Sequence, residues 1–348
     1  MLSRRRVLSS LLALSFLPVL PGSALPALAG ASSLKVLAAS YPAWLLAREV
    51  ADGVPGIETE LLVQAQAGCP HDYMLAPRDL MKLASASVLV AVGKGFEPFL
   101  ADVARECPKL LVLELGADIP RLDLDPGVPG KEAGHAAAGH DEDGHGGHDH
   151  DDQVHAHAHD HAHGHGHGHH HSHAGAGNPH CFASPVQAAR MVRACAQGFA
   201  KLMPAQADVL LANGSQAAGR FEALGRRLAE LGPLGQGVRF VLQHDALSWL
   251  FHDAGLKVAF VLQAEADAQP SASDIASLAR AMRQGQGSYV LVTEPQFPAR
   301  IVEMLVRETG VRVLELDPLA SGPSSPEPGW YEKAMARNIE TLRALLKP

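Results

Sequence analysis

A histidine- and glycine-rich stretch divides the chain and limits how it can fold. Of the 20 histidines in 348 residues, 16 lie between His135 and His173. Residues 130–177 hold almost no large apolar side chain, so this segment cannot bury enough surface to offset the entropy of ordering it. We therefore predict a disordered loop whose imidazoles capture Zn²⁺, Cu²⁺ or Ni²⁺ loosely and reversibly. A linker that only improves solubility is the alternative.

The parts on either side of this stretch share a pattern of short apolar runs. Four strand-like runs precede the loop and four follow it, and a segment with helical spacing follows most of them. The runs cover residues 34–40, 57–63, 87–92, 109–115, 238–243, 257–262, 289–293 and 311–316. This pattern predicts an α/β fold with two lobes, each a mostly parallel four-stranded sheet flanked by helices.

Two helical segments join the predicted lobes. Residues 185–203 and 205–231 have helical spacing, with Pro204 between them. At 1.5 Å per residue the second helix would be about 40 Å long, enough to bridge two lobes. The predicted organisation is an N-terminal lobe over 30–184, a helical segment with the interlobe helix over 185–233, and a C-terminal lobe over 234–348.

The first 29 residues have the features of a cleavable signal peptide. Three arginines at 4–6 precede an apolar stretch over 7–20, and residues 27–29 offer an A-x-A cleavage site. Both the general secretory route and the twin-arginine route fit this leader. No cysteine precedes Cys69, so we expect no N-terminal lipid anchor, and no later run is long and apolar enough to span a membrane. We predict a periplasmic protein.

Composition and motifs argue against two classes of function. The chain has 29 basic and 37 acidic residues, a formal net charge of −8, so we expect no nucleic-acid partner. The sequence has no His-Glu-x-x-His helix and no Gly-x-Ser-x-Gly elbow. Glu294 would be the candidate general base of a zinc hydrolase. We expect no enzyme.

The few histidines outside the loop indicate a metal site. Side chains of metal-binding type lie beside predicted strand or helix ends: His71, His180, His244 and Asp317. Because ligands bind at the carboxyl ends of the strands in open α/β sheets, these four can converge in the cleft between the lobes. Three imidazoles and one carboxylate suit Zn²⁺. His252 lies inside a helical stretch and is interpreted as a solvated helix residue.

Six short motifs carry a family resemblance. They are Pro70-His71-Asp72-Tyr73, Pro77-Arg78-Asp79-Leu80, Asn178-Pro179-His180, His244-Asp245-Ala246, Thr293-Glu294-Pro295-Gln296-Phe297 and Leu316-Asp317-Pro318-Leu319. In order and spacing, from about Leu34 to the C-terminus, they resemble the zinc/manganese class of substrate-binding proteins of bacterial ABC importers. The resemblance is greatest to the zinc-uptake branch with a histidine-rich loop.

This resemblance implies a function and a ligand set. It implies a periplasmic receptor that delivers Zn²⁺ to an inner-membrane ABC permease with its ATPase, and we expect a monomer. The family's metal ligands fall on His71, His180, His244 and Asp317. Manganese-binding relatives usually have a carboxylate in place of the third histidine, so His244 favours zinc. A periplasmic zinc buffer or metallochaperone and a manganese receptor of the same family are the alternatives.

The residues around His180 and the cysteines depart from the family pattern. After His180 the family usually continues with a hydrophobic residue, Trp and an acidic-Pro turn, whereas here Ser184 is predicted to cap the following helix. The four cysteines, which allow three full pairings in an oxidising compartment, are Cys69, Cys107, Cys181 and Cys195. Cys69 and Cys181 flank ligand loops, and we expect a disulfide between them. Free thiols near the metal and a soft fourth ligand from cysteine are the alternatives.

Overall fold

The computed structural model describes residues 33–71, 73–122, 177–263, 271–285, 287–296 and 300–347. All of them belong to a single unit of the fold, Ser33–Pro348. The predicted signal peptide (1–29) and the predicted loop (130–177), apart from Gly177, lie outside the described residues.

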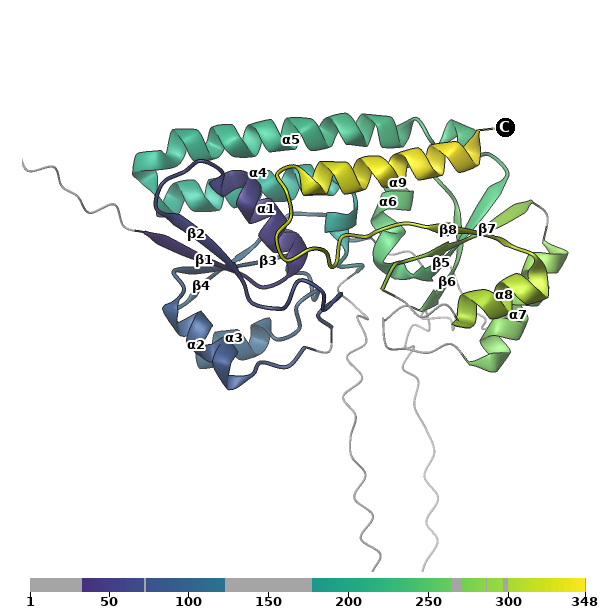
Figure 1. Ribbon diagram of the computed structural model, residues 1–348, viewed down its shortest axis with the longest axis horizontal. Coiled ribbons are helices and arrows are strands. Elements are labelled where there is room, and N and C mark those ends of the chain that lie inside the picture. The colour runs from purple at the N-terminus through teal and green to yellow at the C-terminus, as the bar shows by residue number, and fades with distance from the viewer. Residues whose placement is uncertain are drawn as a thin grey trace, which may run out of the picture. The chain divides into compact units, whose positions relative to one another are not determined.

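Two parallel four-stranded sheets form the framework, as the sequence predicts (Figure 1). The N-terminal sheet has the order β2-β1-β3-β4, with β1 Leu34–Ala38, β2 Ile57–Leu61, β3 Val88–Ala91 and β4 Leu111–Glu114. The C-terminal sheet has the order β6-β5-β7-β8, with β5 Val238–His244, β6 Val258–Gln263, β7 Ser288–Thr293 and β8 Arg312–Glu315. In both sheets the first strand lies between the second and the third. The strand order therefore runs outward from the first strand in both directions. The place where this direction reverses, at the carboxyl ends of the strands, is where ligands bind in open α/β sheets.

Helices cover both faces of the N-terminal sheet (Figure 1). They are α1 (Tyr41–Ala51) and α4 (Pro185–Leu202) on one face, and α2 (Pro77–Ser85) and α3 (Leu100–Glu106) on the other. Because side chains alternate along a strand, Val36 shares a core with Leu46 of α1, whereas its neighbour Leu37 shares another with Leu83 of α2 and Val103 of α3. Burial of both faces explains why β3 is apolar throughout, whereas the edge strand β2 alternates half-buried and exposed residues.

The C-terminal sheet is covered in the same way (Figure 1). Its helices are α6 (Ser248–Asp253) and α9 (Trp330–Leu346) on one face, and α7 (Ala272–Gln284) and α8 (Arg300–Thr309) on the other. Phe240 and Leu242 of β5 join the core that contains α6 and α9 side chains, whereas Val241 packs with Leu278 of α7 and Leu305 of α8.

One long helix contacts elements of both lobes. After a 3₁₀ turn over Pro204–Gln206, α5 covers Ala207–Ala229, 23 residues or about 34 Å. It packs along α4, contacts α1 beside the N-terminal sheet, and contacts α6 and α9 beside the C-terminal sheet. A Cβ at Gly214 would overlap the methyl group of Ala196, so the close approach of α4 and α5 requires glycine there. The interlobe helix is thus confirmed, while the lobe boundaries at 184/185 and 233/234 stay predictions.

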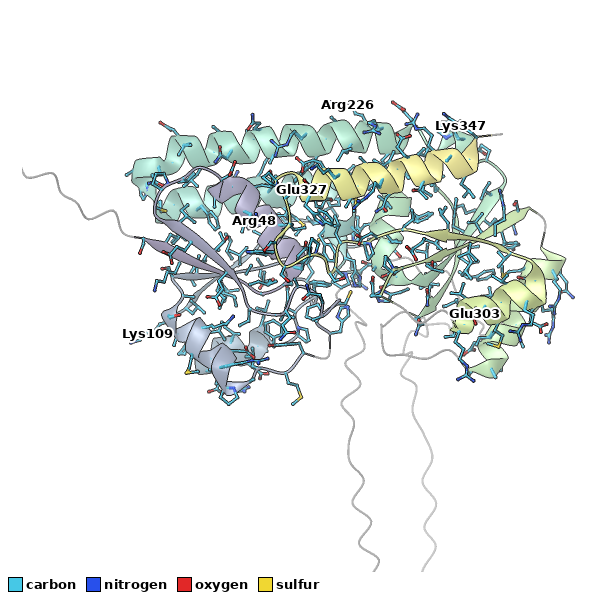
Figure 2. All side chains as sticks on the ribbon, viewed as in Figure 1. Arg48, Lys109, Arg226, Glu303, Glu327 and Lys347 are labelled. Atoms are coloured by element: carbon cyan, nitrogen blue, oxygen red, sulfur yellow. The ribbon has the colours of Figure 1, made fainter. Side chains whose placement is uncertain are left out.

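Charged side chains lie on the outer surfaces of several helices and loops. Figure 2 shows the labelled side chains of Lys109, Arg226, Glu303 and Lys347 directed away from the sheets, and all four residues are exposed. Within the part of the chain that the structure describes, none of the helices combines the length and the apolar character that a membrane crossing needs.

Candidate metal centre

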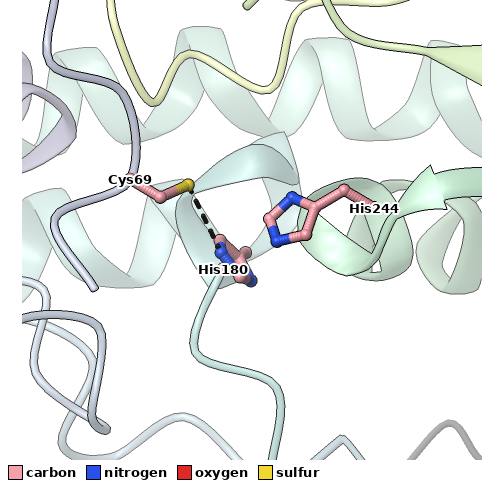
Figure 3. A group of neighbouring side chains, drawn as sticks. All are labelled: Cys69, His180 and His244. Atoms are coloured by element: carbon pink, nitrogen blue, oxygen red, sulfur yellow. Dashed lines mark hydrogen bonds between the residues drawn. The ribbon is translucent and has the colours of Figure 1, made fainter. Parts of the chain in front are cut away.

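The candidate metal centre is built by segments that follow strands of both sheets. Cys69 and His71 lie in the segment between β2 and α2, and His244 is the last residue of β5. His180 immediately precedes the 3₁₀ turn Cys181–Ala183 that leads into α4. Figure 3 shows Cys69 and His244 approaching His180 from opposite sides. Residues far apart in the sequence therefore meet beyond the carboxyl ends of the strands.

His180 is the centre of the cluster. Its Nε2 lies 3.2 Å from Nε2 of His71 and 3.6 Å from Sγ of Cys69, and its ring centroid is 5.1 Å from that of His244. Within the described residues, Cys69, His180 and His244 form a group whose possible metal-donor atoms all lie within 4.8 Å of one another. His180 and His244 are 1% and 0% exposed. His180 thus lies beside both of the other histidines that the sequence singled out, His71 and His244.

Neighbouring acceptors fix the orientation of His180. Oδ1 of Asn178 accepts a hydrogen bond from the His180 backbone N–H (2.8 Å) and lies 3.3 Å from His180 Nδ1, while Oδ1 of Asp245 also lies 3.3 Å from Nδ1. Asn178 is itself held, because its Nδ2 donates to the Asp245 carbonyl (2.9 Å) and its carbonyl accepts from Trp249 Nε1 (3.0 Å). With its proton on Nδ1, His180 presents the lone pair of Nε2 toward His71 and Cys69.

Carboxylates orient His244 and make its surroundings negative. Its Nδ1 lies 3.3 Å from Oε1 of buried Glu294, and its Nε2 lies 3.4 Å from Oδ1 of Asp245. Glu294 is held in turn by Nε2 of Gln296, which donates to its other oxygen (2.5 Å). Burial acts to lower the pKa of His244, but the hydrogen bond and charge of Glu294 and the charge of Asp245 outweigh it and raise that pKa. Burial and the same two carboxylates raise the pKa of the Cys69 thiol well above its ordinary value. Such surroundings favour a cation.

Asp317 lies outside the cluster of donor atoms. It follows β8, and its Oδ1 accepts a hydrogen bond from the backbone N–H of Leu319 (2.7 Å). Asn338 holds its backbone on both sides, accepting from the Asp317 N–H (3.1 Å) and donating to its carbonyl (2.7 Å). Burial is the main cause of a raised pKa at Asp317, with the charge of Glu294 contributing. Its role as a metal ligand stays a prediction.

Aromatic rings shield one side of the cluster. The centroid of the fully buried Phe96 ring lies 5.5 Å from that of His71 and 5.4 Å from that of His180. The loop before Phe96 turns sharply, with Lys94 at φ 56° between two glycines with positive φ. This apolar wall excludes water and so strengthens the electrostatic attraction between a bound cation and its ligands.

The expected disulfide between Cys69 and Cys181 is wrong. All four cysteines, each within a described segment, are free thiols. Cys69 faces His180, whereas Cys181 is fully buried, with its Sγ 3.7 Å from Sδ of Met191. Packing in the N-terminal core thus directs the Cys181 sulfur to Met191, while the Cys69 sulfur faces the imidazole cluster.

Two local predictions near the site are confirmed. Ser184 caps α4, since its Oγ accepts a hydrogen bond from the backbone N–H of Val186 (3.2 Å). His252 is an exposed residue of α6, with its Nδ1 2.9 Å from Oδ1 of Asp253.

Sequence reasoning gave Asp245 no role in the site. This residue lies next to His244 in the motif His244-Asp245-Ala246. Because carboxylates often orient metal-binding imidazoles, an acidic residue beside such a histidine could have indicated this role from sequence. Its carboxylate lies near both His180 and His244, so one side chain supports two candidate ligands.

Two parallel sheets joined by a long helix, with the candidate ligands at their facing strand ends, define the fold of a two-lobed substrate-binding protein. Solved structures share it. The SBP FpvC from Pseudomonas aeruginosa in complex with Mn²⁺ matches with a TM-score of 0.68 at 23% identity, covering 90% of this chain and 98% of FpvC. A crystal structure of ZnuA matches with a TM-score of 0.63 at 19% identity, covering 90% of this chain and 99% of that one.

The sequence assigns the family. The family model described as "Zinc-uptake complex component A periplasmic" matches residues 36–345, and the chain belongs to this family. The zinc-binding protein AdcA of Streptococcus pyogenes serotype M1 is 26% identical over 325 residues, which cover 89% of this chain and 55% of AdcA. The high-affinity zinc uptake system protein ZnuA of Yersinia pestis is 28% identical over 301 residues, covering 84% of this chain and 85% of that protein. The chain thus spans about half the length of AdcA but most of ZnuA.

Proposed function

We propose that this chain is a periplasmic receptor that captures Zn²⁺ at His71, His180 and His244 and delivers it to an inner-membrane ABC permease with its ATPase. The convergence of three imidazoles from three separate segments carries this proposal. Membership of the zinc-uptake family and similarity to the zinc-binding protein AdcA and the zinc uptake protein ZnuA support it.

The spacing of the donor atoms suits zinc. With Zn–N bonds of about 2.0–2.1 Å, two nitrogens of a tetrahedral site lie about 3.3 Å apart. The observed separation of the His71 and His180 Nε2 atoms is 3.2 Å. Glu294 and Asp245 supply the outer carboxylates that orient metal-binding imidazoles in protein sites. The family resemblance implies Asp317 as the fourth ligand, and its carboxylate accepts a hydrogen bond from the backbone of Leu319.

We propose that the chain binds zinc without catalysing a reaction. A catalytic zinc site keeps a coordination position open for water or substrate, whereas a site filled by four side chains does not. Glu294, the candidate general base, accepts a hydrogen bond from Gln296 and faces His244. It acts here as an orienting group.

The cellular setting is part of the proposal. The arginine-rich leader and its A-x-A site favour export to the periplasm. We propose a monomer that meets its permease there. A manganese receptor of the same family is less well supported, because Mn²⁺ prefers oxygen donors and this cluster offers nitrogen and sulfur.

Zinc uptake by cells tests the proposal. Cells that lack the chromosomal copy should regain uptake of radioactive zinc from chelator-treated medium when they express the unsubstituted protein or H252A, but not H180A. The rescue should also require the cognate permease. Rescue without the permease would instead indicate a periplasmic buffer or metallochaperone, and equal rescue by H180A would contradict the assigned site.

A further inference from the structure

The thiol of Cys69 faces Nε2 of His180, as the imidazole of His71 does. It lies two residues before His71, and its Sγ is 3.6 Å from His180 Nε2 (Figure 3). Cys69, His180 and His244 are a group whose donor atoms all lie within 4.8 Å of one another; neither Asp317 nor His71 is in this group, but His71 Nε2 lies 3.2 Å from His180 Nε2. The thiol therefore occupies the place that a fourth ligand would need.

The sulfur is at the distance that a tetrahedral zinc site requires. With a Zn–S bond of about 2.3 Å and a Zn–N bond of about 2.05 Å, sulfur and nitrogen lie about 3.6 Å apart. The observed distance is 3.6 Å, and the His71–His180 distance of 3.2 Å is close to the nitrogen–nitrogen separation of the same tetrahedron. Both distances, which share His180 Nε2, are therefore compatible with one tetrahedral ion.

We propose that Cys69 is the fourth ligand of the captured metal, which makes a site with three imidazoles and one thiolate. This inference rests on the proposed function, because it concerns the same zinc ion. On binding, the Cys69 S–H bond breaks, the proton leaves to solvent, and the sulfur lone pair forms the bond to the metal. Asp317 then keeps its hydrogen bond to the backbone of Leu319.

A thiolate ligand has a consequence for selectivity. Soft sulfur donors favour Zn²⁺, Cd²⁺ and Cu⁺, whereas Mn²⁺ favours carboxylates, carbonyls and water. Three neutral imidazoles and one thiolate leave one net positive charge on the complex, and the carboxylates of Glu294 and Asp245 lie beside it. The site thus discriminates against Mn²⁺ by ligand chemistry.

Cadmium titration of the full chain tests this proposal. Cd²⁺ bound to a thiolate gives an ultraviolet charge-transfer absorption that imidazole and carboxylate ligands do not give. The unsubstituted protein should reach full absorption at one Cd²⁺ per chain, and so should C107S and D317N. C69S should lose the absorption and bind at least about tenfold more weakly, since even indirect supports of metal ligands contribute ten- to hundredfold. Cys107 is the matched control, because it is also a half-buried free thiol.

The contrary outcomes separate this proposal from the proposed function. Tight binding of one Cd²⁺ without the absorption would overturn Cys69 as a ligand while leaving zinc capture intact. The absence of any tight metal binding would overturn both. If C69S does not fold, alkylation of the unsubstituted protein decides: zinc should slow modification of Cys69 at least about tenfold and leave Cys107 unchanged. Equal rates at Cys69 with and without zinc would contradict the proposal.

Discussion

Nδ1 of His244 lies 3.3 Å from Oε1 of Glu294, and both side chains are buried. The carboxylate thus selects the tautomer with a proton on Nδ1, which leaves the Nε2 lone pair available to a metal. It also places a negative charge behind the ligand and so increases the basicity of the imidazole.

Removing this charge should weaken zinc binding without abolishing it. We expect E294Q to reduce zinc affinity about 10- to 100-fold, the usual effect of losing an outer partner of a metal-binding histidine. A competition titration against a chromogenic chelator measures the change. E303Q, at an exposed position of α8, is the control and should bind as the unsubstituted protein does. An unchanged affinity in E294Q would show that Glu294 does not support the site.

The three imidazoles should each be required for tight binding. H71A and H244A should lower zinc affinity by more than about a hundredfold, because losing a ligand costs more than losing its outer partner. H252A removes an exposed histidine from α6 and should change the affinity less than about twofold. Equilibrium dialysis with all three variants provides the comparison. Similar zinc affinities for H244A and H252A would show that His244 is not a metal ligand.

The composition of residues 130–177 predicts a second, weaker class of metal sites. Each ion bound there must order a glycine-rich backbone, and that entropy cost keeps the affinity below that of a preformed site. Calorimetry on the full chain should therefore show one tight phase followed by a weaker phase with several ions. Deletion of residues 130–176 should remove only the weaker phase. A single phase with one ion in the full chain would contradict this interpretation.

Glu97 should make stability depend on pH in the metal-free protein. Its carboxylate accepts hydrogen bonds from Ser40 Oγ (2.5 Å) and from the backbone N–H groups of Val92 and Gly93 (both 2.9 Å). Burial nevertheless raises the pKa of Glu97 from 4.5 to about 7. The folded state therefore keeps this proton at pH values where the unfolded state loses it.

The sign of the effect follows from proton linkage. The free energy of unfolding should fall as the pH rises from about 4.5 to about 7, by about 3 kcal/mol from this group. In E97Q that part of the pH dependence should disappear, whatever the substitution does to stability at one pH. Urea unfolding at a series of pH values, with a chelator present, measures how the free energy of unfolding changes with pH in the unsubstituted protein and in E97Q. Identical slopes in the two proteins would show that Glu97 titrates normally.

Local patterns were enough to predict the sheets and the long helix. All eight runs overlap an observed strand, and β3, which is buried along its whole length, is apolar throughout. Pro204 marks the observed break between α4 and α5. His71, His180 and His244 were identified because histidine is rare outside the loop and each precedes or follows a predicted element.

The immediate surroundings of the histidines were beyond prediction from sequence. Cys69 meets His180 across 111 residues of sequence, and its direction depends on how the segment after β2 packs against the loop before α4. The disulfide expectation failed for the same reason, since packing turns Cys181 toward Met191. Asp317 was predicted from its position after a predicted strand and from the family resemblance, whereas its hydrogen bond to Leu319 becomes visible only in the folded chain.

A zinc titration of the protein that lacks residues 130–176 tests the central claim most directly. The protein, first stripped of metal, would compete with a chromogenic chelator for zinc, alone and as H180A. We predict that the unsubstituted chain takes one Zn²⁺ from the chelator and that H180A takes none at the same concentrations. Failure of the unsubstituted chain to bind zinc, or equal binding by H180A, would contradict a zinc site built around His180.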